Sequence, residues 1–403
     1  MRRVVVTGLG MINALGSDAK SSFKAICEGQ CGVDKITLFD ASDFPVQIAA
    51  QVKNFEPERY IEDAKEIKKL DRFIQLAHAA SDEAIKDANL KDYDIDDYGV
   101  SSAAGIGGLP NIEKNSNICL ERGARKISPF FIPSALVNML GGVLSIKYKL
   151  RGPNISSVTA CAASTHAIIE AAKTIMLGEA TGMLVIGAES TICPVGIGGF
   201  AAMKALSTRN DEPATASRPF DKGRDGFVMG EGAGALMLEE YESAKARAAK
   251  IYAEIIGFGE TGDAHHITSP SQDGPQRAIQ RALKMAGNPK IDYINAHGTS
   301  TPANDKNETA TLKAVFGDNV PPISSIKGQI GHCLGAAGAI EAVSTLLAME
   351  QGILPPTINQ FEKDEDCDLD YVPNKARKMP INVAMSENFG FGGTNGVVIF
   401  KKV

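Results

Sequence analysis

Short runs of β-branched and other apolar residues alternate along this chain with longer alanine-rich segments, and this alternation constrains the fold more than any other feature. Each run has the length and composition of a buried strand, and each alanine-rich segment is long enough for a helix. Strands that alternate with helices predict an α/β fold with parallel strands. The expected strands are residues 4–9, 155–160, 183–188, 235–240, 251–258, 291–296, 321–326 and 395–400.

The two halves of the chain share a faint internal similarity. In the first half, an expected strand leads through Cys161 into an alanine-rich helix that ends at Gly178. In the second half, a strand leads through His332 into a helix of small residues that ends at Gly352. Glycine suits the position that follows a helix C-terminus. We therefore expect two copies of a strand, reactive residue and helix, with the two helices packed closely at the centre.

Composition narrows the class of protein. The chain has 403 residues, 44% of them hydrophobic, which is ample for a large α/β core. Its net charge of −6 gives no general attraction to nucleic acid, and no apolar run reaches the roughly 20 residues of a membrane span. The seven cysteines include no CxxC pair, so neither a disulfide framework nor a zinc cage is expected. These features predict a reduced cytoplasmic protein that binds neither nucleic acid nor membrane.

Several common catalytic motifs are absent from the sequence. The segment GLGMIN at residues 8–13 has Asn13 where a dinucleotide fingerprint requires glycine. The sequence also lacks GxxxxGKS/T, HExxH and GxSxG, which excludes simple forms of a P-loop NTPase, a zincin and an α/β-hydrolase. We expect no cofactor and no metal.

Three reactive side chains lie where strands are expected to end. Cys161 stands between a strand and a helix, whose N-terminal N–H groups favour a thiolate. His297 follows the strand at 291–296, and His332 lies near the start of the next helix. A lone cysteine is more often a small buried apolar residue, and a lone histidine is more often structural. A thiol and two imidazoles at the carboxyl ends of strands, where α/β sheets bind ligands, together predict a catalytic site.

A glycine-rich segment, NFGFGGTNG at residues 388–396, joins two regions near the C-terminus. Its glycines are typical of a tight turn that needs positive φ. The same segment is also suited to bring a backbone N–H group close to a reacting oxygen. The sequence leaves both interpretations open.

Long motifs along nearly the whole chain resemble the β-ketoacyl-acyl-carrier-protein synthases, the condensing enzymes of fatty acid synthesis. The matching segments include VVVTGLGMINALG, RGPNISSVTACAAS, FDKGRDGFVMGEGAG, NAHGTSTPANDK, GHCLGAAGAIEA and ENFGFGGTNG. RKISPFF, DAHHITSP and IYAEIIGFG look more like the type II elongating enzyme than type I. The resemblance implies a thiolase-like fold, with two duplicated α/β halves in a five-layered αβαβα arrangement. It places an N-terminal half at residues 1–250 and a C-terminal half at 251–403, and it implies a homodimer.

The resemblance also assigns roles to residues. It implies that Cys161 is the nucleophile and that His297 and His332 are the catalytic histidines, supported by Lys327 and by Glu341. Phe391 matches a phenylalanine that gates the pocket, and its backbone N–H forms the oxyanion hole together with that of the nucleophile. Thr299 and Thr301 match residues that line the malonyl and pantetheine channel, and Ile106 and Phe131 match the acyl pocket. The family presents basic residues to an acidic acyl carrier protein, here Lys65, Lys68, Lys69, Arg125, Lys126 and Lys204.

The implied reaction is a decarboxylative Claisen condensation, and the three reactive groups suit it. A thiolate can take an acyl group from a thioester carrier. Malonyl carrier then loses carbon dioxide, and two neutral imidazoles can donate hydrogen bonds to the enolate oxygen. We expect the nearby helix N-terminus to lower the pKa of His332. Lys327 is expected to order the His332 side of the site through Glu341.

Other activities use similar groups. The alternatives are a type I condensing enzyme and, in another reaction class, a Cys-His thioesterase or amidase, which leaves the second imidazole unexplained. A biosynthetic thiolase carries a second reactive cysteine in its glycine-rich loop, where this chain has Phe391. A non-catalytic chain-length partner lacks the nucleophile that Cys161 provides, and the initiating condensing enzymes use His and Asn rather than two histidines.

Overall fold

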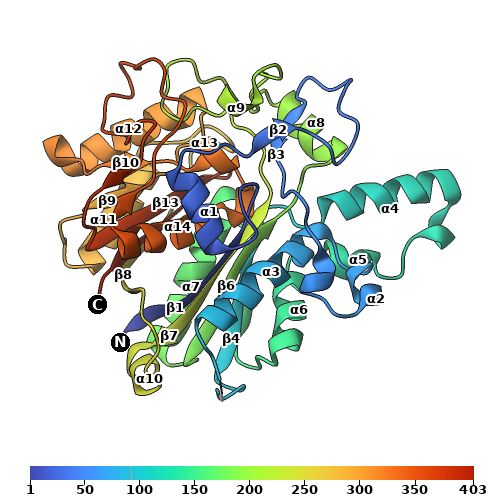
Figure 1. Ribbon diagram of the computed structural model, residues 1–403, viewed down its shortest axis with the longest axis horizontal. Coiled ribbons are helices and arrows are strands. Elements are labelled where there is room, and N and C mark those ends of the chain that lie inside the picture. Colours follow the sequence, from blue (N-terminus) through green and yellow to red (C-terminus); the bar gives the residue numbers. More distant parts are fainter. Residues whose placement is uncertain (92) are drawn as a thin grey trace.

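The computed structural model describes residues 1–91 and 93–403, and a ten-stranded sheet runs through its centre (Figure 1). The strand order is β10-β9-β13-β14-β8-β1-β7-β6-β4-β5. Every expected strand overlaps one of these, and the predicted α/β class is confirmed. The strands are β1 (Val4–Ile12), β4 (Tyr98–Ala103), β5 (Asn154–Ser157), β6 (Gly182–Glu189), β7 (Gly232–Glu240), β8 (Ala253–Gly262), β9 (Tyr293–Asn295), β10 (Ile323–Ser324), β13 (Val383–Gly390) and β14 (Thr394–Lys401). Two small sheets pair β2 (Val33–Lys35) with β3 (Ile48–Ala50), and β11 (Ile353–Leu354) with β12 (Arg377–Lys378).

The expectation of parallel strands is wrong for the middle of the sheet. Parallel pairs occur toward its two ends, where β4 pairs with β5 and β6, and β9 pairs with β10 and β13. Between them, the pairs β6–β7, β7–β1, β1–β8, β8–β14 and β14–β13 are all antiparallel. One reason is the β13–β14 hairpin, in which Gly392 and Gly393 take φ of 85° and 69° and reverse the chain within three residues.

The sheet consists of two halves with the same topology. From the seam outward, the first half runs β1-β7-β6-β4-β5 and the second runs β8-β14-β13-β9-β10. When the five strands of each half are numbered along the chain, both halves have the same spatial order: first, last, fourth, second, third. Two residue pairs on β1 and β8, Val5 with Glu254 and Val6 with Ala253, join the halves. The repeated order confirms the predicted duplication.

Helices form three layers around the two halves of the sheet (Figure 1). α7 (Ala163–Leu177) and α14 (Ala337–Gln351) form the central layer, and α14 contacts both β7 and β13. α3 (Arg72–Asp87) covers β1 and β7 on one outer face, and α11 (Asp273–Met285) covers β8 and β14 on the other. The apolar core is divided accordingly, with α7 and α14 in one cluster and α3 in another. This is the predicted five-layered arrangement.

The remaining helices lie around this body, and α4 projects away from it (Figure 1). No helix among the described residues is both long enough and apolar enough to span a membrane. The remaining helices, which surround the sheet and the four helices named above, are α1 (Ala19–Cys27), α2 (Ala64–Ile67), α4 (Leu109–Arg122), α5 (Phe131–Ala135), α6 (Met139–Tyr148), α8 (Pro194–Ala202), α9 (Pro213–Ala216), α10 (Tyr241–Ala246), α12 (Pro302–Phe316) and α13 (Lys327–Ile330).

The two central helices approach each other closely at their N-terminal ends. A Cβ atom on Gly338 of α14 would lie 2.2 Å from the hydroxyl oxygen of Thr165 on α7. The backbone N–H of Ala339 donates a hydrogen bond of 2.8 Å to Ser164 Oγ. Both helices end at a glycine in the left-handed conformation, as expected from the sequence. This crossing brings together the segments that carry Cys161 and His332.

Candidate active site

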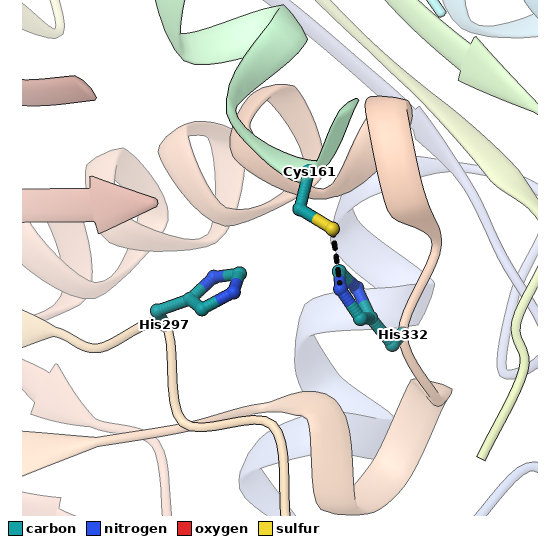
Figure 2. A group of neighbouring side chains, drawn as sticks. All are labelled: Cys161, His297 and His332. Atoms are coloured by element: carbon teal, nitrogen blue, oxygen red, sulfur yellow. Dashed lines mark hydrogen bonds between the residues drawn. The ribbon is translucent and has the colours of Figure 1, made fainter. Parts of the chain in front are cut away.

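Cys161 lies in a tight turn, η3 (Ala160–Ala162), between β5 and α7. Ala160 has a φ of 49°, a left-handed conformation that bends the strand abruptly into the helix. The side chain of Cys161 points toward His332, with 3.1 Å between Sγ and Nε2 (Figure 2). Cys161 as a whole is 9% exposed, so its thiol is buried.

The two histidines come from neighbouring strand ends in the second half. His297 follows β9, and His332 lies between α13 and a turn, η5 (Leu334–Ala336). Their ring centroids lie 5.4 Å apart with the rings nearly perpendicular. One ligand atom from each histidine and Cys161 Sγ all lie within 4.8 Å of one another (Figure 2). The structure thus brings the three predicted reactive groups together.

These groups line a cavity of about 600 Å³. The predicted channel residues Thr299 and Thr301, the predicted acyl-pocket residue Ile106, and Phe391 also line it. Phe131 does not line the cavity; it lies half-buried at the start of α5. Apolar side chains make up much of the remaining wall, among them Phe200, Met203, Phe227, Ile267, Leu334 and Phe389.

Asn388 on β13 orients the ring of His297. Its amide nitrogen lies 2.7 Å from Glu341 Oε2 and 3.3 Å from His297 Nδ1. Its amide oxygen accepts a hydrogen bond from Thr165, which fixes the orientation of the amide. Because Nδ1 of His297 accepts this bond, the ring proton lies on Nε2.

Lys327 is also connected to His297. Its buried ammonium group forms an ion pair with Glu341 and donates a hydrogen bond of 2.6 Å to the backbone oxygen of His297. The prediction that Lys327 and Glu341 order the His332 side therefore differs from what the structure shows. The difference follows from the sheet, because Lys327 comes just after β10, which pairs with β9 beside His297.

Both histidines are neutral in this environment. Burial lowers the pKa of His297 and of His332 well below the usual value, and the positive charge of Lys327 lowers it further. The lowered pKa of His332 agrees in direction with the prediction from the sequence, but its main cause is burial and not a helix N-terminus. Nδ1 of His332 has no hydrogen-bond partner among the described residues.

The thiol of Cys161 differs from the expected thiolate. Burial raises its pKa to about 12, and the negative charge of Glu189 acts in the same direction. The charge of Lys327 and the backbone N–H groups of Phe391 and Cys161 oppose this rise. The free protein therefore holds a neutral thiol beside a neutral imidazole, and the two backbone N–H groups point toward the sulfur.

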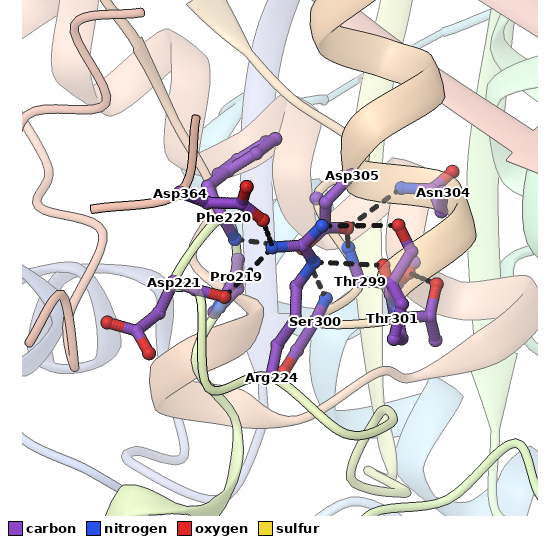
Figure 3. A network of polar contacts seen from close by, with 12 residues as sticks. Pro219, Phe220, Asp221, Arg224, Thr299, Ser300, Thr301, Asn304, Asp305 and Asp364 are labelled. Carbon is purple, nitrogen blue, oxygen red and sulfur yellow. Dashed lines mark hydrogen bonds and ion pairs between the residues drawn. The ribbon is translucent and has the colours of Figure 1, made fainter. Parts of the chain in front are cut away.

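An acidic residue that the sequence analysis missed shapes the loop after His297. Asp305 on α12 accepts hydrogen bonds from the backbone N–H groups of Thr299 at 3.0 Å, Ser300 at 3.1 Å and Phe220 at 2.8 Å (Figure 3). The hydroxyl groups of Thr299 and Thr301 lie 2.9 Å apart. The carboxylate therefore fixes the loop that presents both threonines to the cavity.

A buried arginine supports this loop from the other side. Arg224 forms ion pairs with Asp305, at 3.7 Å, and with Asp364 (Figure 3). It also donates hydrogen bonds to the backbone oxygens of Asp221 at 2.9 Å and of Pro302 at 3.2 Å. This network joins the loop before α12 to the segment that follows α9.

Glu308 is a further acidic residue that the sequence analysis missed. Its carboxylate accepts hydrogen bonds from the backbone N–H groups of His297 at 2.7 Å and Gly298 at 2.8 Å. A signal was available, because Asp305 and Glu308 are three residues apart and therefore share one face of the helix after His297. Asn388 and Arg224 stand inside the quoted glycine-rich and FDKGRDG motifs, but their partners are distant in sequence.

The predicted carrier-binding residues are exposed or half-buried at the surface. Lys65, Lys68, Arg125 and Lys126 are exposed, and Lys69 is half-buried with its ammonium group 4.9 Å from the ring of Phe130. That contact brings the segment around α2 next to the segment before α5. Lys204 is exposed just after α8 and lines the cavity.

The same three reactive groups have the chemistry of metal ligands. Zinc binds cysteine thiolate and histidine nitrogen, and catalytic zinc sites use three protein ligands. A metal ion could bind here only after Cys161 lost its proton, and it would compete with any acyl group for the sulfur.

Comparison with known proteins identifies the relatives of this chain. Residues 1–244 match the family model described as "Beta-ketoacyl synthase, N-terminal domain", and residues 252–361 match "Beta-ketoacyl synthase, C-terminal domain". The chain is 51% identical to 3-oxoacyl-(acyl-carrier-protein) synthase 2 of Coxiella burnetii and 49% identical to that of Vibrio harveyi. Each alignment covers 100% of this chain and 99% of the relative.

Solved structures agree with the sequence matches. A β-ketoacyl synthase from Burkholderia phymatum superposes with a TM-score of 0.94 at 37% identity, covering 100% of both chains. A type II polyketide ketosynthase, solved in complex with its acyl carrier protein, superposes with a TM-score of 0.91 at 35% identity. That match covers 100% of this chain and 99% of the other. The predicted thiolase-like fold is thus confirmed, and this chain belongs to the β-ketoacyl synthase family.

Proposed function

We propose that the protein is an elongating 3-oxoacyl-acyl-carrier-protein synthase that condenses malonyl carrier with an acyl group held on Cys161. The observation that carries the proposal is the convergence of one thiol and two neutral imidazoles in a largely apolar cavity. The two relatives that are 51% and 49% identical to this chain over nearly their full length are named 3-oxoacyl-(acyl-carrier-protein) synthase 2. Their names favour the elongating type II enzyme over type I.

In the first step, Cys161 attacks the carbonyl carbon of an acyl-carrier thioester. His332 accepts the thiol proton across the 3.1 Å contact and passes it to the departing carrier thiol. The backbone N–H groups of Cys161 and Phe391 stabilise the oxyanion, each contributing about 3 kcal/mol in comparable enzymes. A new thioester forms on Cys161 as the carrier thioester breaks, so the step is close to thermoneutral.

In the second step, malonyl carrier enters and its carboxylate leaves as carbon dioxide. The electron pair of the broken C–C bond forms an enolate, whose oxygen accepts hydrogen bonds from His297 Nε2–H and from His332. The enolate carbon attacks the acyl carbonyl on Cys161, and the C–S bond breaks. The thiolate that leaves takes up one proton from solvent, because its own proton departed with the carrier thiol in the first step. Lys327, Glu341 and Asn388 act as positioning residues for His297.

The acyl carrier protein is the proposed partner. Its acidic surface suits the basic residues around α2 and before α5, and Lys204 stands at the cavity. Homodimer formation, a cytoplasmic location and a boundary between halves at residues 250 and 251 stay predictions from the sequence. So does the contact of Phe131 with the acyl chain.

A Cys-His thioesterase is the alternative from another reaction class. It needs one imidazole and a path for water. Here both histidines are only 3% exposed, and they lie in a largely apolar cavity. The second imidazole and its network of Lys327, Glu341 and Asn388 have no role in that reaction. The proposed condensation uses all of these groups.

The test is intact-mass analysis after incubation with acyl carriers of several chain lengths, followed by malonyl carrier. We expect a covalent acyl adduct that maps to Cys161 and disappears with formation of a β-ketoacyl carrier. In the Cys161→Gln variant, condensation should be lost while carbon dioxide release from malonyl carrier continues. Hydrolysis of the acyl adduct to free acid, without a condensation product, would favour the thioesterase.

A further inference from the structure

Glu189 is a buried carboxylate that the proposed chemistry does not use. It is the last residue of β6 and is fully buried. Its oxygens accept hydrogen bonds from four backbone N–H groups: Gly105 at 2.5 Å, Gly107 at 2.9 Å, Gly335 at 3.0 Å and Ile106 at 3.2 Å. Burial raises the pKa of Glu189, and the four N–H groups, which favour the ionised carboxylate, oppose this rise.

The four N–H groups belong to two segments of the cavity wall. Residues 105–107 follow β4, and among them Gly105 and Ile106 line the cavity. Gly335 lies in η5, next to the cavity residue Leu334 and just after His332. Four N–H donors converge on one point inside the protein, and an acceptor with two oxygens is needed to satisfy them.

The two segments also touch each other directly behind the nucleophile. A Cβ atom on Gly335 would lie 2.0 Å from the backbone nitrogen of Gly105. A Cβ atom on Gly105 would lie 2.8 Å from Glu189 Oε2 and 3.5 Å from the backbone oxygen of Ala160, which precedes Cys161. The carboxylate therefore holds together a close contact that leaves no room for side chains.

We propose that Glu189 is a positioning residue for the acyl-binding wall. Its carboxylate ties residues 105–107 to the segment after His332, and so sets the space that Ile106 and Leu334 leave for an acyl chain on Cys161. This inference rests on the proposed function, because it concerns the acyl group that Cys161 accepts.

The test compares Glu189→Gln and Glu189→Asp with the parent enzyme. Glutamine keeps the size but turns an N–H₂ donor toward N–H donors, and aspartate keeps the charge but is shorter by one methylene group. We expect kcat/KM for acylation of Cys161 to fall about 10- to 100-fold in both variants, as misplaced reacting groups do. The preference between short and long acyl carriers should also change in both.

A second readout separates charge from shape. The negative charge of Glu189 is one cause of the raised pKa of Cys161, so Glu189→Gln should speed alkylation of Cys161 at a fixed pH. Glu189→Asp keeps the negative charge, so it should not speed alkylation of Cys161. The matched control is Glu239→Gln, since Glu239 is also fully buried but contacts Tyr98 and Arg247, which lie outside the cavity wall. This control should lower stability and keep the parent's chain-length preference.

The outcomes distinguish this inference from the function on which it rests. If the parent takes up no acyl group, the proposed function fails. If the parent is acylated and both Glu189 variants keep its chain-length preference, the inference is overturned, whether or not all rates fall together. If Glu189→Gln does not fold, Glu189→Asp alone decides, because its chain-length preference either changes or stays as in the parent.

Discussion

At the scale of single residues, His297 and His332 differ in how they are held. His297 is fixed by Asn388 at its ring, by Lys327 at its backbone oxygen and by Glu308 at its backbone nitrogen. His332 is held by backbone bonds to residues 228 and 230 and has a free ring nitrogen, Nδ1, among the described residues. The two imidazoles can therefore serve different steps, with His297 restricted to donation and His332 able to exchange a proton with Cys161.

This difference leads to a prediction about the two histidine variants. We expect His297→Ala and His332→Ala each to lower the rate of carbon dioxide release from malonyl carrier about 10²- to 10³-fold, the usual cost of one donor to an oxyanion. His332→Ala should also slow acylation of Cys161, and His297→Ala should leave it nearly intact. Release of labelled carbon dioxide and intact mass measure the two steps separately. Normal carbon dioxide release in either variant would contradict the paired-donor mechanism.

The second residue-scale prediction concerns the pH dependence of Cys161. Its pKa of about 12 means that only the neutral thiol is populated near pH 7, and that the thiolate fraction rises about tenfold per pH unit. The rate of alkylation by iodoacetamide should therefore keep rising between pH 7 and 9. Peptide mapping measures it, and Cys161→Ser reports labelling of the other cysteines. A rate that is already constant at pH 7 would indicate a preformed thiolate.

At the scale of helices and strands, the crossing of α7 and α14 holds the two reactive ends together. Its closest point is Gly338, where any side chain would meet Thr165. We expect Gly338→Val to lower the free energy of unfolding by about 1–3 kcal/mol through overpacking, and to reduce condensation as the helix ends shift. Denaturant unfolding and the condensation assay measure the two effects.

The control for this variant is a helical glycine with space around it. A Cβ atom on Gly142 of α6 would meet only the sulfur of Met139, at 3.9 Å. Gly142→Ala should therefore keep the activity and stabilise the helix by up to about 1 kcal/mol. Equal stability of Gly338→Val and the parent would show that the crossing has more room than the distances indicate.

The strands show which parts of the fold the sequence can reveal. β1, β6 and β14 contain buried β-branched residues, and β7 contains buried leucine, methionine and alanine, so the composition of these four strands predicts them. β4 and β13 were missed because serine, glycine, glutamate and asparagine occupy their buried positions. In β4 the buried Ser101 hydroxyl has a distant partner, since it donates a hydrogen bond of 2.8 Å to the backbone oxygen of Ala167, and no sequence period reveals such a partner.

The same limit applies to the site. Cys161 and His297 could be predicted because each follows a strand that the sequence reveals, and His332 could be predicted because it precedes a helix of small residues. Asn388 and Arg224 could not, because their roles depend on which segments meet in space. The neutral state of Cys161 depends on burial, which a single sequence does not give.

At the scale of the whole molecule, β5 forms one edge of the sheet and has no strand beyond it among the described residues. Ile155 on β5 and the following Val158 are 36% and 54% exposed, and exposed apolar residues on an edge strand favour association. We expect the predicted homodimer to form through this edge, and the double variant Ile155→Lys and Val158→Lys to be monomeric in sedimentation velocity. Leu177→Lys, an exposed apolar residue at the end of α7, is the control and should stay dimeric. A monomeric parent, or a dimeric double variant, would contradict this prediction.

The duplicated architecture has a consequence for how the protein becomes active. The sulfur comes from one copy of the repeated unit and both imidazoles come from the other, with the central helices docked between them. A nascent chain with only its first copy folded carries a thiol but no imidazole beside it. Turnover therefore begins only after the last strands have joined the sheet, so the appearance of activity during refolding reports completion of the entire molecule.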